Sequence, residues 1–217
     1  MQKQSTSFVH VAAVAGMIAG IGDFAVTLIL GFFYPNYNHL RFVMSELGTA
    51  QSPIALWVNA WWVLFGVLFV VFAIGLWQGF MEHGTPAAVI ALMVALFGLG
   101  AGIGGGLFPM EPGGLETTLV GRLHGVFAGI GFMTIAFVPL AALWLFPRSS
   151  NPRLFWLSVG VFILGLILFG LFIAAEDVAG SRSLLAYAGL WQRLFLLNHY
   201  AYLGLFAARM LHHNDVR

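Results

Sequence analysis

The sequence contains no cysteine and very few charged residues. The absence of cysteine excludes disulfides, cysteine-ligated zinc, iron–sulfur clusters and thiolate nucleophiles. Charged residues make up only 8% of the 217 residues, compared with about 25% in an ordinary soluble domain. Because 60% of the residues are apolar, most of the surface is predicted to face lipid rather than water. These features place the chain among integral membrane proteins.

Six apolar segments are long enough to cross a hydrocarbon core of about 30 Å, which requires roughly 20 helical residues. None shows the alternation of apolar and polar residues that is typical of a membrane barrel. Backbone polar groups in lipid must then be satisfied within helices. The sequence predicts an all-α fold, a polytopic bundle of six transmembrane helices forming one domain over residues 1–217. The predicted spans are residues 8–33, 54–80, 86–108, 123–146, 154–174 and 185–211.

The first span could be mistaken for a signal peptide, because Lys3 precedes its apolar run. It carries Asp23 and lacks a convincing cleavage site, so we predict a retained span. If the N-terminus is cytoplasmic, five of the nine lysine and arginine residues lie on the cytoplasmic side and four on the opposite side. We therefore expect both termini to be cytoplasmic.

Three long loops gather on the predicted outer side, at residues 34–53, 108–125 and 174–193. Long loops on a rigid scaffold often carry function. In the first of them, residues 39–48 have apolar spacings of three and four, which predicts a short interfacial helix ending at Gly48. Ser45 and Glu46 would finish this helix and hold the loop to Arg41 or another outer arginine, or they would contribute to a binding site.

Several ionisable side chains lie within the spans, where each costs roughly 2.5 to 3.5 kcal/mol near the bilayer centre. They are expected to face the bundle or the outer interface: Asp23, Arg122, His124, Arg193 and His199. Asp23 shares a helix face with Gly16 and Gly20, so it is either a hydrogen-bonded packing residue or a proton-relay group acting with His124 or His199.

Glycines form patterns in two of the predicted spans. A stripe at Gly121, Gly125 and Gly129 predicts tight helix packing. Residues 98–106 hold six glycines and contain a literal G-x-G-x-x-G; because no strand precedes it, we expect close packing or a kink instead of a dinucleotide site.

The polar residues of the fourth and sixth spans fall on defined helix faces. Arg122 and His124 lie about 200° apart, so one should face the bundle and the other the headgroups. Gln192 and His199 share a face beside Arg193, and Asn198 with Tyr202 forms a second polar edge. The last span is therefore predicted to line a cavity or a hydrogen-bond network.

No catalytic or metal-binding motif is recognisable, so whether the protein is an enzyme stays open. The spacings H-x-x-x-H and H-E-x-x-H are absent; no cofactor is expected, and haem or a metal at His124 and His199 is the minor alternative. Ser45 with a histidine and an acidic residue supplies the residue types of a serine hydrolase, but G-x-S-x-G is missing.

Four short motifs follow one another along the chain: SELG at residues 45–48, FPME at 108–111, RLHG at 122–125 and GL-x-x-R at 189–193. In this order the sequence resembles the prokaryotic family catalogued as domain of unknown function 998, over essentially the whole chain. The resemblance implies a six-span protein of a prokaryotic plasma or inner membrane, without an established activity. The family often has Asp in the FP turn and an acidic residue before the last arginine, where this chain has Glu111 and Gln192.

Three functional hypotheses follow. In the first, the protein is an accessory factor with an outer pocket that binds a lipid headgroup or small ligand, and Arg193 or Arg122 contacts an anionic group. In the second it is a structural subunit of a larger membrane complex, and in the third a lipid-acting enzyme or proton-coupled transporter. Membrane lipids, and in the second hypothesis other membrane subunits, are the expected partners; nucleic acid is not. The candidate ligand-binding residues are Ser45, Glu46, Glu111, Arg122, His124, Gln192, Arg193 and His199.

Overall fold

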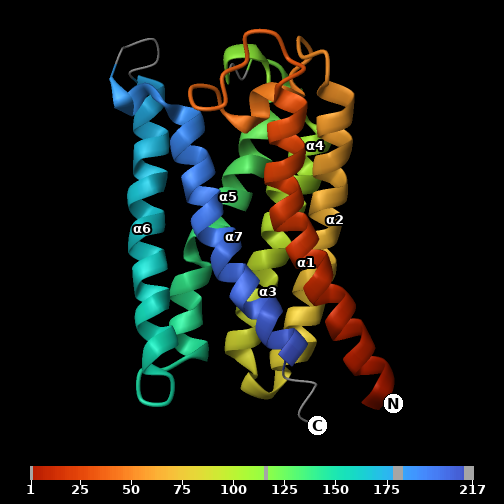
Figure 1. Cartoon of the computed structure of the whole chain (residues 1–217), viewed down its shortest axis with the longest axis vertical. Helices are drawn as coiled ribbons and strands as arrows, with labels where there is room; N and C mark the ends of the chain where they lie inside the picture. Colours follow the sequence, from red (N-terminus) through yellow and green to blue (C-terminus); the bar gives the residue numbers. More distant parts are fainter. Residues whose placement is uncertain (1, 115–116, 178–182, 213–217) are drawn as a thin grey trace.

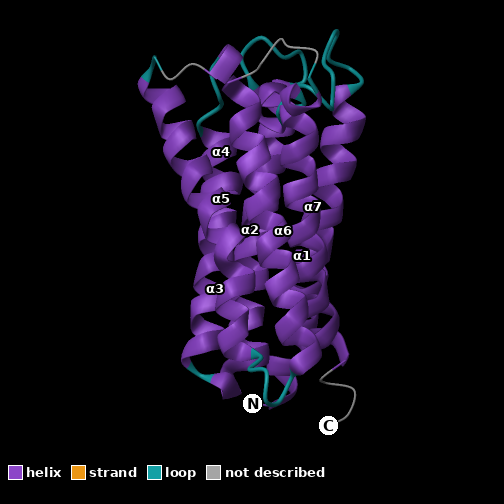
Figure 2. Cartoon of the chain, turned by 90° about the vertical axis from the view of Figure 1, so that its left-hand side faces the viewer, coloured by secondary structure: helices purple, strands orange, loops and turns teal. Residues whose placement is uncertain are grey.

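The structure, a computed structural model, is a bundle of six helical rods and describes residues 2–114, 117–177 and 183–212 (Figures 1 and 2). No strand occurs in these ranges. The long helices are α1 (Gln2–Gly31), α2 (Ala55–Phe80), α3 (Thr85–Phe97), α5 (Leu119–Leu145), α6 (Pro152–Asp177) and α7 (Ala188–His212). A π-helical segment, η3 (Gly98–Gly104), and the short α4 (Gly105–Leu107) extend α3 into the third rod. The predicted all-α membrane bundle is confirmed.

The bundle has two distinct ends. Both termini and the two short connections, residues 81–84 and 146–151, lie at one end, which we call the termini end (Figure 1). The three long loops lie together at the other, which we call the loop end. The structure contains no membrane, so the assignment of the loop end to the outside stays a prediction.

Five of the rods are apolar enough to cross a membrane by length and composition, and α7 is the sixth. α7 is of similar length, but it carries Gln192, Arg193, Asn198 and His199. It packs against α1 on one side and α6 on the other, and eleven of its residues are buried. A helix that is covered by its neighbours can hold polar groups that lipid would not accept.

Aromatic rings fill the centre of the bundle, where α2, α3 and α7 meet. Phe65 and Phe69 of α2 contact Phe97 of α3 with ring centroids 5.7 and 5.1 Å apart. Tyr200 of α7 closes the same cluster, 5.9 Å from Phe69. Such edge-to-face contacts add about 0.5–1.5 kcal/mol per pair beyond the burial of apolar area.

The glycine-rich third rod packs closely on both sides, as predicted. A Cβ on Gly100 would lie 2.5 Å from the carbonyl oxygen of Phe127 and 2.9 Å from the nitrogen of Gly131, both in α5. On the opposite side, a Cβ on Gly98 would lie 2.8 Å from the carbonyl oxygen of Gly66 in α2. Only glycine lets three backbones approach this closely.

The glycine stripe predicted on α5 is wrong in its membership. A Cβ on Gly129 would meet nothing within 4 Å, and one on Gly121 would meet the Glu111 side chain of the preceding loop. The residue that packs against the third rod is Gly131, where a Cβ would lie 2.6 Å from the nitrogen of Ala101. The helix is rotated so that Gly121 faces the preceding loop and Gly129 faces open space.

The interfacial helix predicted over residues 39–48 is also wrong in its first half. Only η1 (Met44–Gly48) is helical, as a single 3₁₀ segment. The side chain of Asn38 accepts hydrogen bonds from the backbone nitrogens of Leu40 and Arg41, at 3.0 and 3.1 Å. This local turn competes with a helical start, and Val43 is extended.

Candidate functional site

A cavity of about 260 Å³ lies at the loop end between α5, α6 and α7, beneath the first two long loops. We call it the loop-end cavity. Its polar side chains are Ser45 of η1, His124 of α5 and Gln192 of α7. Its apolar wall is formed by Phe132, Phe169, Phe172 and Ile173, with further contributions from Val43, Met110, Gly114, Gly121, Ala128 and Gly129.

Gln192 positions the serine of this cavity. Its side chain is buried, and its Oε1 accepts a hydrogen bond of 2.6 Å from the backbone nitrogen of Met44. This bond joins the start of η1 to α7 across 148 positions in the sequence. Ser45, the next residue, is thereby held at the cavity wall.

His124 is oriented by the end of the third rod. Its Nδ1 lies 2.7 Å from the carbonyl oxygen of Phe108. Because a carbonyl only accepts hydrogen bonds, Nδ1 must carry the proton, and in the neutral ring Nε2 is the acceptor. Phe108 is itself stacked on Phe127 with centroids 5.4 Å apart, which fixes the histidine further.

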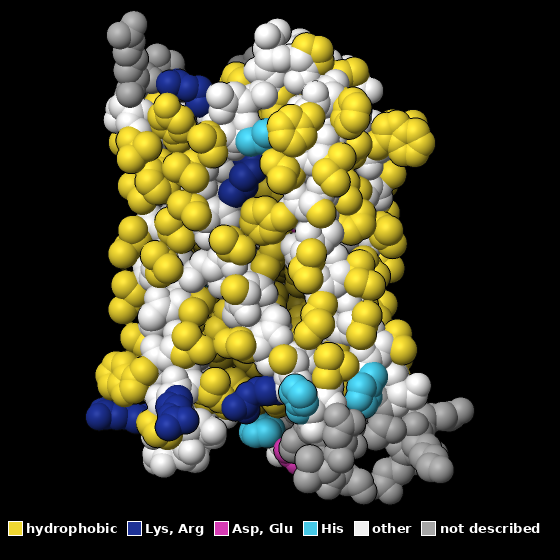
Figure 3. Space-filling view, viewed as in Figure 1, with side chains coloured by type: hydrophobic (Ala, Val, Ile, Leu, Met, Phe, Trp, Pro, Cys, Tyr) yellow, Lys and Arg dark blue, Asp and Glu magenta, His cyan; other side chains and the backbone are white. Residues whose placement is uncertain are grey.

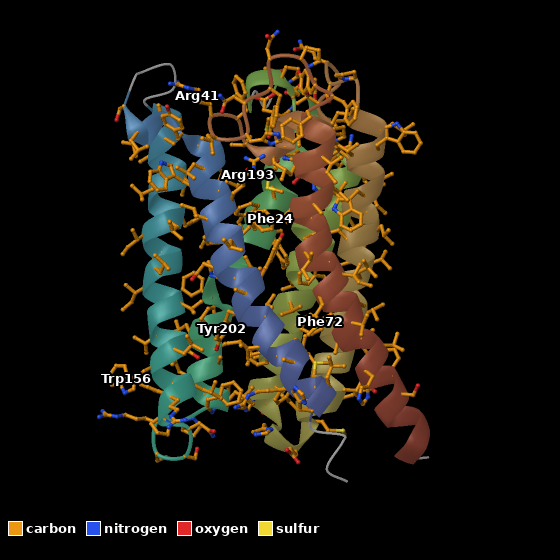
Figure 4. All side chains as sticks on the ribbon, viewed as in Figure 1. Phe24, Arg41, Phe72, Trp156, Arg193 and Tyr202 are labelled. Atoms are coloured by element: carbon orange, nitrogen blue, oxygen red, sulfur yellow. The ribbon has the colours of Figure 1, made fainter. Side chains whose placement is uncertain are left out.

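Arg193 lies close to this region but binds the first loop instead of lining the cavity (Figure 4). Its guanidinium donates to the carbonyl oxygens of His39 and Phe42 and to the hydroxyl of Tyr37, the last at 2.9 Å. Burial and the nearby Arg193 charge lower the pKa of His39. Burial raises the pKa of Tyr37, against the opposing effect of Arg193.

Glu111 organises the start of α5. Its carboxylate accepts hydrogen bonds from the backbone nitrogen of Thr117 at 2.6 Å and from that of Thr118 at 3.2 Å. Thr118 in turn accepts from the backbone nitrogen of Gly121 as the N-cap of the helix. Desolvation raises the pKa of Glu111, but the hydrogen bonds from Thr118 and Thr117 outweigh it and hold the pKa below its ordinary value.

Arg122 and His124 point in different directions, as predicted: Arg122 is exposed and His124 is buried. His199 is buried elsewhere, on the side of α7 that faces Gly165 of α6, with its Nδ1 2.8 Å from the carbonyl oxygen of Phe195. Glu46 is partly exposed and does not line the cavity. The ligand-binding role of all eight candidates stays a prediction.

Three of those eight candidates, Ser45, His124 and Gln192, therefore line one cavity. Neither Arg193 nor Arg122 does, so neither of the two arginines predicted to contact an anionic group is among the described lining residues. In the described part of the chain, no three histidine or acidic side chains converge as metal ligands do.

A second, smaller space adjoins the loop-end cavity. This buried chamber, of about 40 Å³, shares Ser45, Phe132 and Gln192 with it and reaches Asp23 and Tyr200. Asp23 accepts hydrogen bonds from the hydroxyl of Tyr200 at 2.9 Å and from Nε1 of Trp61 at 3.4 Å. Ser45 and Gln192 therefore line both spaces, and the smaller one extends to the buried Asp23 carboxylate through a lining that is mostly apolar.

Tyr200 is the main site residue that the sequence analysis missed. Gln192, Leu196 and Tyr200 follow one another at intervals of four, so they share a face of α7. That spacing was a usable signal. The second polar edge predicted on the last span, Asn198 with Tyr202, forms hydrogen bonds with α6. Asn198 donates to the carbonyl oxygen of Val161 at 2.9 Å, and the hydroxyls of Tyr202 and Ser158 are 2.5 Å apart.

Comparison with known proteins bears on the family and not on the activity. No curated protein and no solved structure matches the chain. One family, described as "Protein of unknown function (DUF998)", matches residues 17–209, from the first long helix to the last. The match includes each of the four short motifs and every residue of the loop-end cavity. The chain therefore belongs to the DUF998 family of membrane proteins.

Proposed function

We propose that the loop-end cavity binds a membrane amphiphile, with its headgroup among Ser45, His124 and Gln192 and its chain against the phenylalanines. The observation that carries this proposal is the order of the lining residues along α5. His124 lies near the loop end of the helix, whereas Phe132 lies 8 residues below it, about 12 Å at 1.5 Å per residue. Polar groups at the level of the headgroups and apolar groups below them match a lipid.

The chemistry of the lining favours recognition by hydrogen bonds. Among the lining residues that the structure describes, none is a lysine, arginine, aspartate or glutamate. A serine hydroxyl, a carboxamide and an imidazole supply both donors and acceptors. A headgroup that carries hydroxyl or amide groups fits this set better than one that depends on an ion pair.

The cavity also has a route of entry from the membrane. Gly129 lines it and is exposed on the surface of α5. A side chain added at this position would meet no neighbouring atom within 4 Å. A chain can therefore enter sideways between α5 and α6 without passing through the loops.

The test is to purify the protein in a mild detergent and identify retained lipids by native mass spectrometry. Gly129→Leu fills the entry and should remove the lipid bound in this cavity, seen as the loss of one bound lipid mass per protein. Gly170→Leu is the matched control, because Gly170 is an exposed glycine of α6 whose added side chain also meets nothing, and it lies outside the cavity. His124→Ala should weaken retention by removing one headgroup contact.

Two results would contradict the proposal. The first is equal lipid retention in Gly129→Leu and Gly170→Leu. The second is a wild-type protein that carries no lipid but co-purifies with another membrane subunit, which would support the structural-subunit hypothesis instead.

A further inference from the structure

A larger cavity, of about 970 Å³, lies at the termini end, separate from the loop-end cavity. We call it the termini-end cavity. α6 and α7 form its long walls, and residues from the ends of α1, α2 and α5 complete it. Figure 3 shows arginine and histidine side chains gathered at this end, below a surface that is mainly apolar.

The walls of this cavity are apolar and partly open to lipid. Leu154 and Leu157 of α6 face Leu205 and Ala208 of α7 across it. Leu157 and Leu205 are 41% and 42% exposed, so the space opens on the lipid-facing side of the bundle. Hydrocarbon chains are the natural occupants of such a groove.

An adjacent tryptophan indicates where the termini-end cavity lies relative to the membrane–water interface. Trp156 of α6 is exposed at the termini end, and the guanidinium of Arg148 lies 5.2 Å from the centre of its ring (Figure 4). Exposed tryptophan and arginine in contact are typical of the membrane–water interface. Leu154 and Leu157 flank Trp156, so the groove begins at headgroup level.

The polar end of the groove is cationic. Arg209 lines it from the last turn of α7, with its guanidinium 5.3 Å from the centre of the Phe146 ring. Asn151, His83 and His212 are further polar lining residues, and Glu82 is the one acidic residue in the lining that the structure describes. Across the described side chains at this end, Arg148, Arg153 and Arg209 outnumber Glu82.

From this arrangement we propose that the termini-end cavity binds a phospholipid with an anionic headgroup. The phosphate lies against Arg209 and Asn151, and an acyl chain lies between α6 and α7 along Leu157 and Leu205. A basic pocket between transmembrane helices is the arrangement that holds acidic headgroups. The planar guanidinium, already held over a ring, can donate two hydrogen bonds to phosphate without further ordering.

This site differs from the loop-end cavity in its ligand chemistry and in its leaflet. The described lining of the loop-end cavity contains no arginine, whereas that of the termini-end cavity contains Arg209. The two cavities share no lining residue. Each can therefore be removed without touching the other.

The experiment follows thermal unfolding in detergent by tryptophan fluorescence, with added phosphatidylglycerol or phosphatidylcholine of the same acyl chains. The anionic lipid should raise the Tm of the wild type further than the zwitterionic lipid, by on the order of 5 °C near saturation. Arg209→Gln should abolish this difference. Arg148→Gln, which removes an arginine at the same end that lies outside the cavity, should preserve it.

Further variants keep the test decisive if Arg209→Gln folds poorly. Leu157→Trp narrows the groove at a lipid-exposed position and should reduce the response to phosphatidylglycerol. Gly129→Leu, which acts on the loop-end cavity, should leave that response unchanged. If Gly129→Leu removes it while Arg209→Gln does not, the lipid binds at the loop end and the present inference is wrong.

Other outcomes would overturn the inference directly. They are an equal response to the two lipids in the wild type, an equal loss in Arg209→Gln and Arg148→Gln, and full stabilisation by inorganic phosphate alone. The last would show that the cavity recognises a soluble anion and not a lipid.

Discussion

At the scale of single residues, two neighbours on α7 hold the first loop over the loop-end cavity. Gln192 accepts a hydrogen bond from Met44, and Arg193 donates to the carbonyl oxygens of His39 and Phe42. A hydrogen bond to a charged group contributes about 1.5–3 kcal/mol. Because the partners named here are backbone atoms, Gln192 and Arg193 hold the loop through its backbone.

Gly189, four positions before Arg193, lets the backbone of the first loop lie directly against α7. A Cβ on Gly189 would overlap the carbonyl oxygens of Phe42 and His39 and lie 2.8 Å from the Arg193 guanidinium. The backbone nitrogen of Leu190 also donates to the carbonyl oxygen of Leu40 at 2.8 Å. The GL-x-x-R motif is thus a docking site for the loop.

Glu111 gives a pH-dependent prediction at the same scale. Its hydrogen bonds to Thr117 and Thr118 hold its pKa below the ordinary value of 4.5, so folding stabilises the charged form. For a carboxylate with a lowered folded pKa, the contribution to stability is complete above the unfolded pKa and is lost as pH falls through the folded pKa. Glu111→Gln should lower the Tm at pH 7, and the difference should shrink as pH falls below about 4.5.

The measurement is thermal unfolding of both proteins in the same detergent from pH 7 to pH 3.5. Glu82→Gln, at the opposite end of the bundle, is the control for general charge effects. A Tm difference that stays constant over this range would contradict the role of Glu111 as a charged acceptor.

At the scale of elements, the third rod lies between α2 and α5, and its glycines bring its backbone into direct contact with both helices. Its π-helical segment presents Gly98 to Gly66 and Gly100 to Gly131, so backbone meets backbone on both sides. Packing of this kind relies on van der Waals contact, because lipid removes the hydrophobic drive between helices. Even one methyl group is too large there.

Gly100→Ala should therefore destabilise the protein although alanine is the better helix former by about 1 kcal/mol. Its new Cβ would lie 2.5 Å from the carbonyl oxygen of Phe127, a backbone atom that can move only if α5 moves. A cost of about 1–3 kcal/mol is typical of such overpacking. Gly170→Ala, with open space around the added methyl group, should be neutral or stabilising in the same thermal assay. Equal Tm values for the two variants would show that the third rod and α5 can move apart without loss of stability.

At the scale of the whole molecule, the number of basic residues at each end of the bundle bears on its orientation in the membrane. The described arginines divide equally, with Arg148, Arg153 and Arg209 at the termini end and Arg41, Arg122 and Arg193 at the loop end. Over the full sequence, Lys3 and Arg217 bring the termini side to five basic residues, whereas Arg182 brings the other side to four. Positive charge is retained on the cytoplasmic side of a membrane. The termini are therefore expected to be cytoplasmic.

The absence of cysteine makes this expectation easy to test. Gln51→Cys places one thiol on the exposed first loop, and Ser150→Cys places one on the exposed turn at the termini end. A membrane-impermeant maleimide should label the first variant in intact cells and the second only after permeabilisation. The reverse pattern would invert the orientation, and labelling of both in intact cells would place the two ends on one side.

The sequence by itself determined the membrane class, the positions of the six rods and the grouping of the long loops at one end. These properties follow from hydrophobicity and from the need to satisfy backbone groups in lipid, both of which are local or compositional. The depth of a polar residue along its helix was also predictable, because rise per residue is fixed. His124 and Gln192 were chosen as polar residues within predicted spans, and both line the loop-end cavity.

Only the tertiary structure decided which polar side chains meet. Asp23 and Tyr200 are hydrogen-bonded across 177 positions, and Arg193 is engaged by loop carbonyls that carry no signal of it in the sequence. The rotation of each helix about its axis also replaced Gly129 with Gly131 at the contact with the third rod. Rotation and long-range pairing depend on the simultaneous packing of several helices, which no single stretch of sequence specifies.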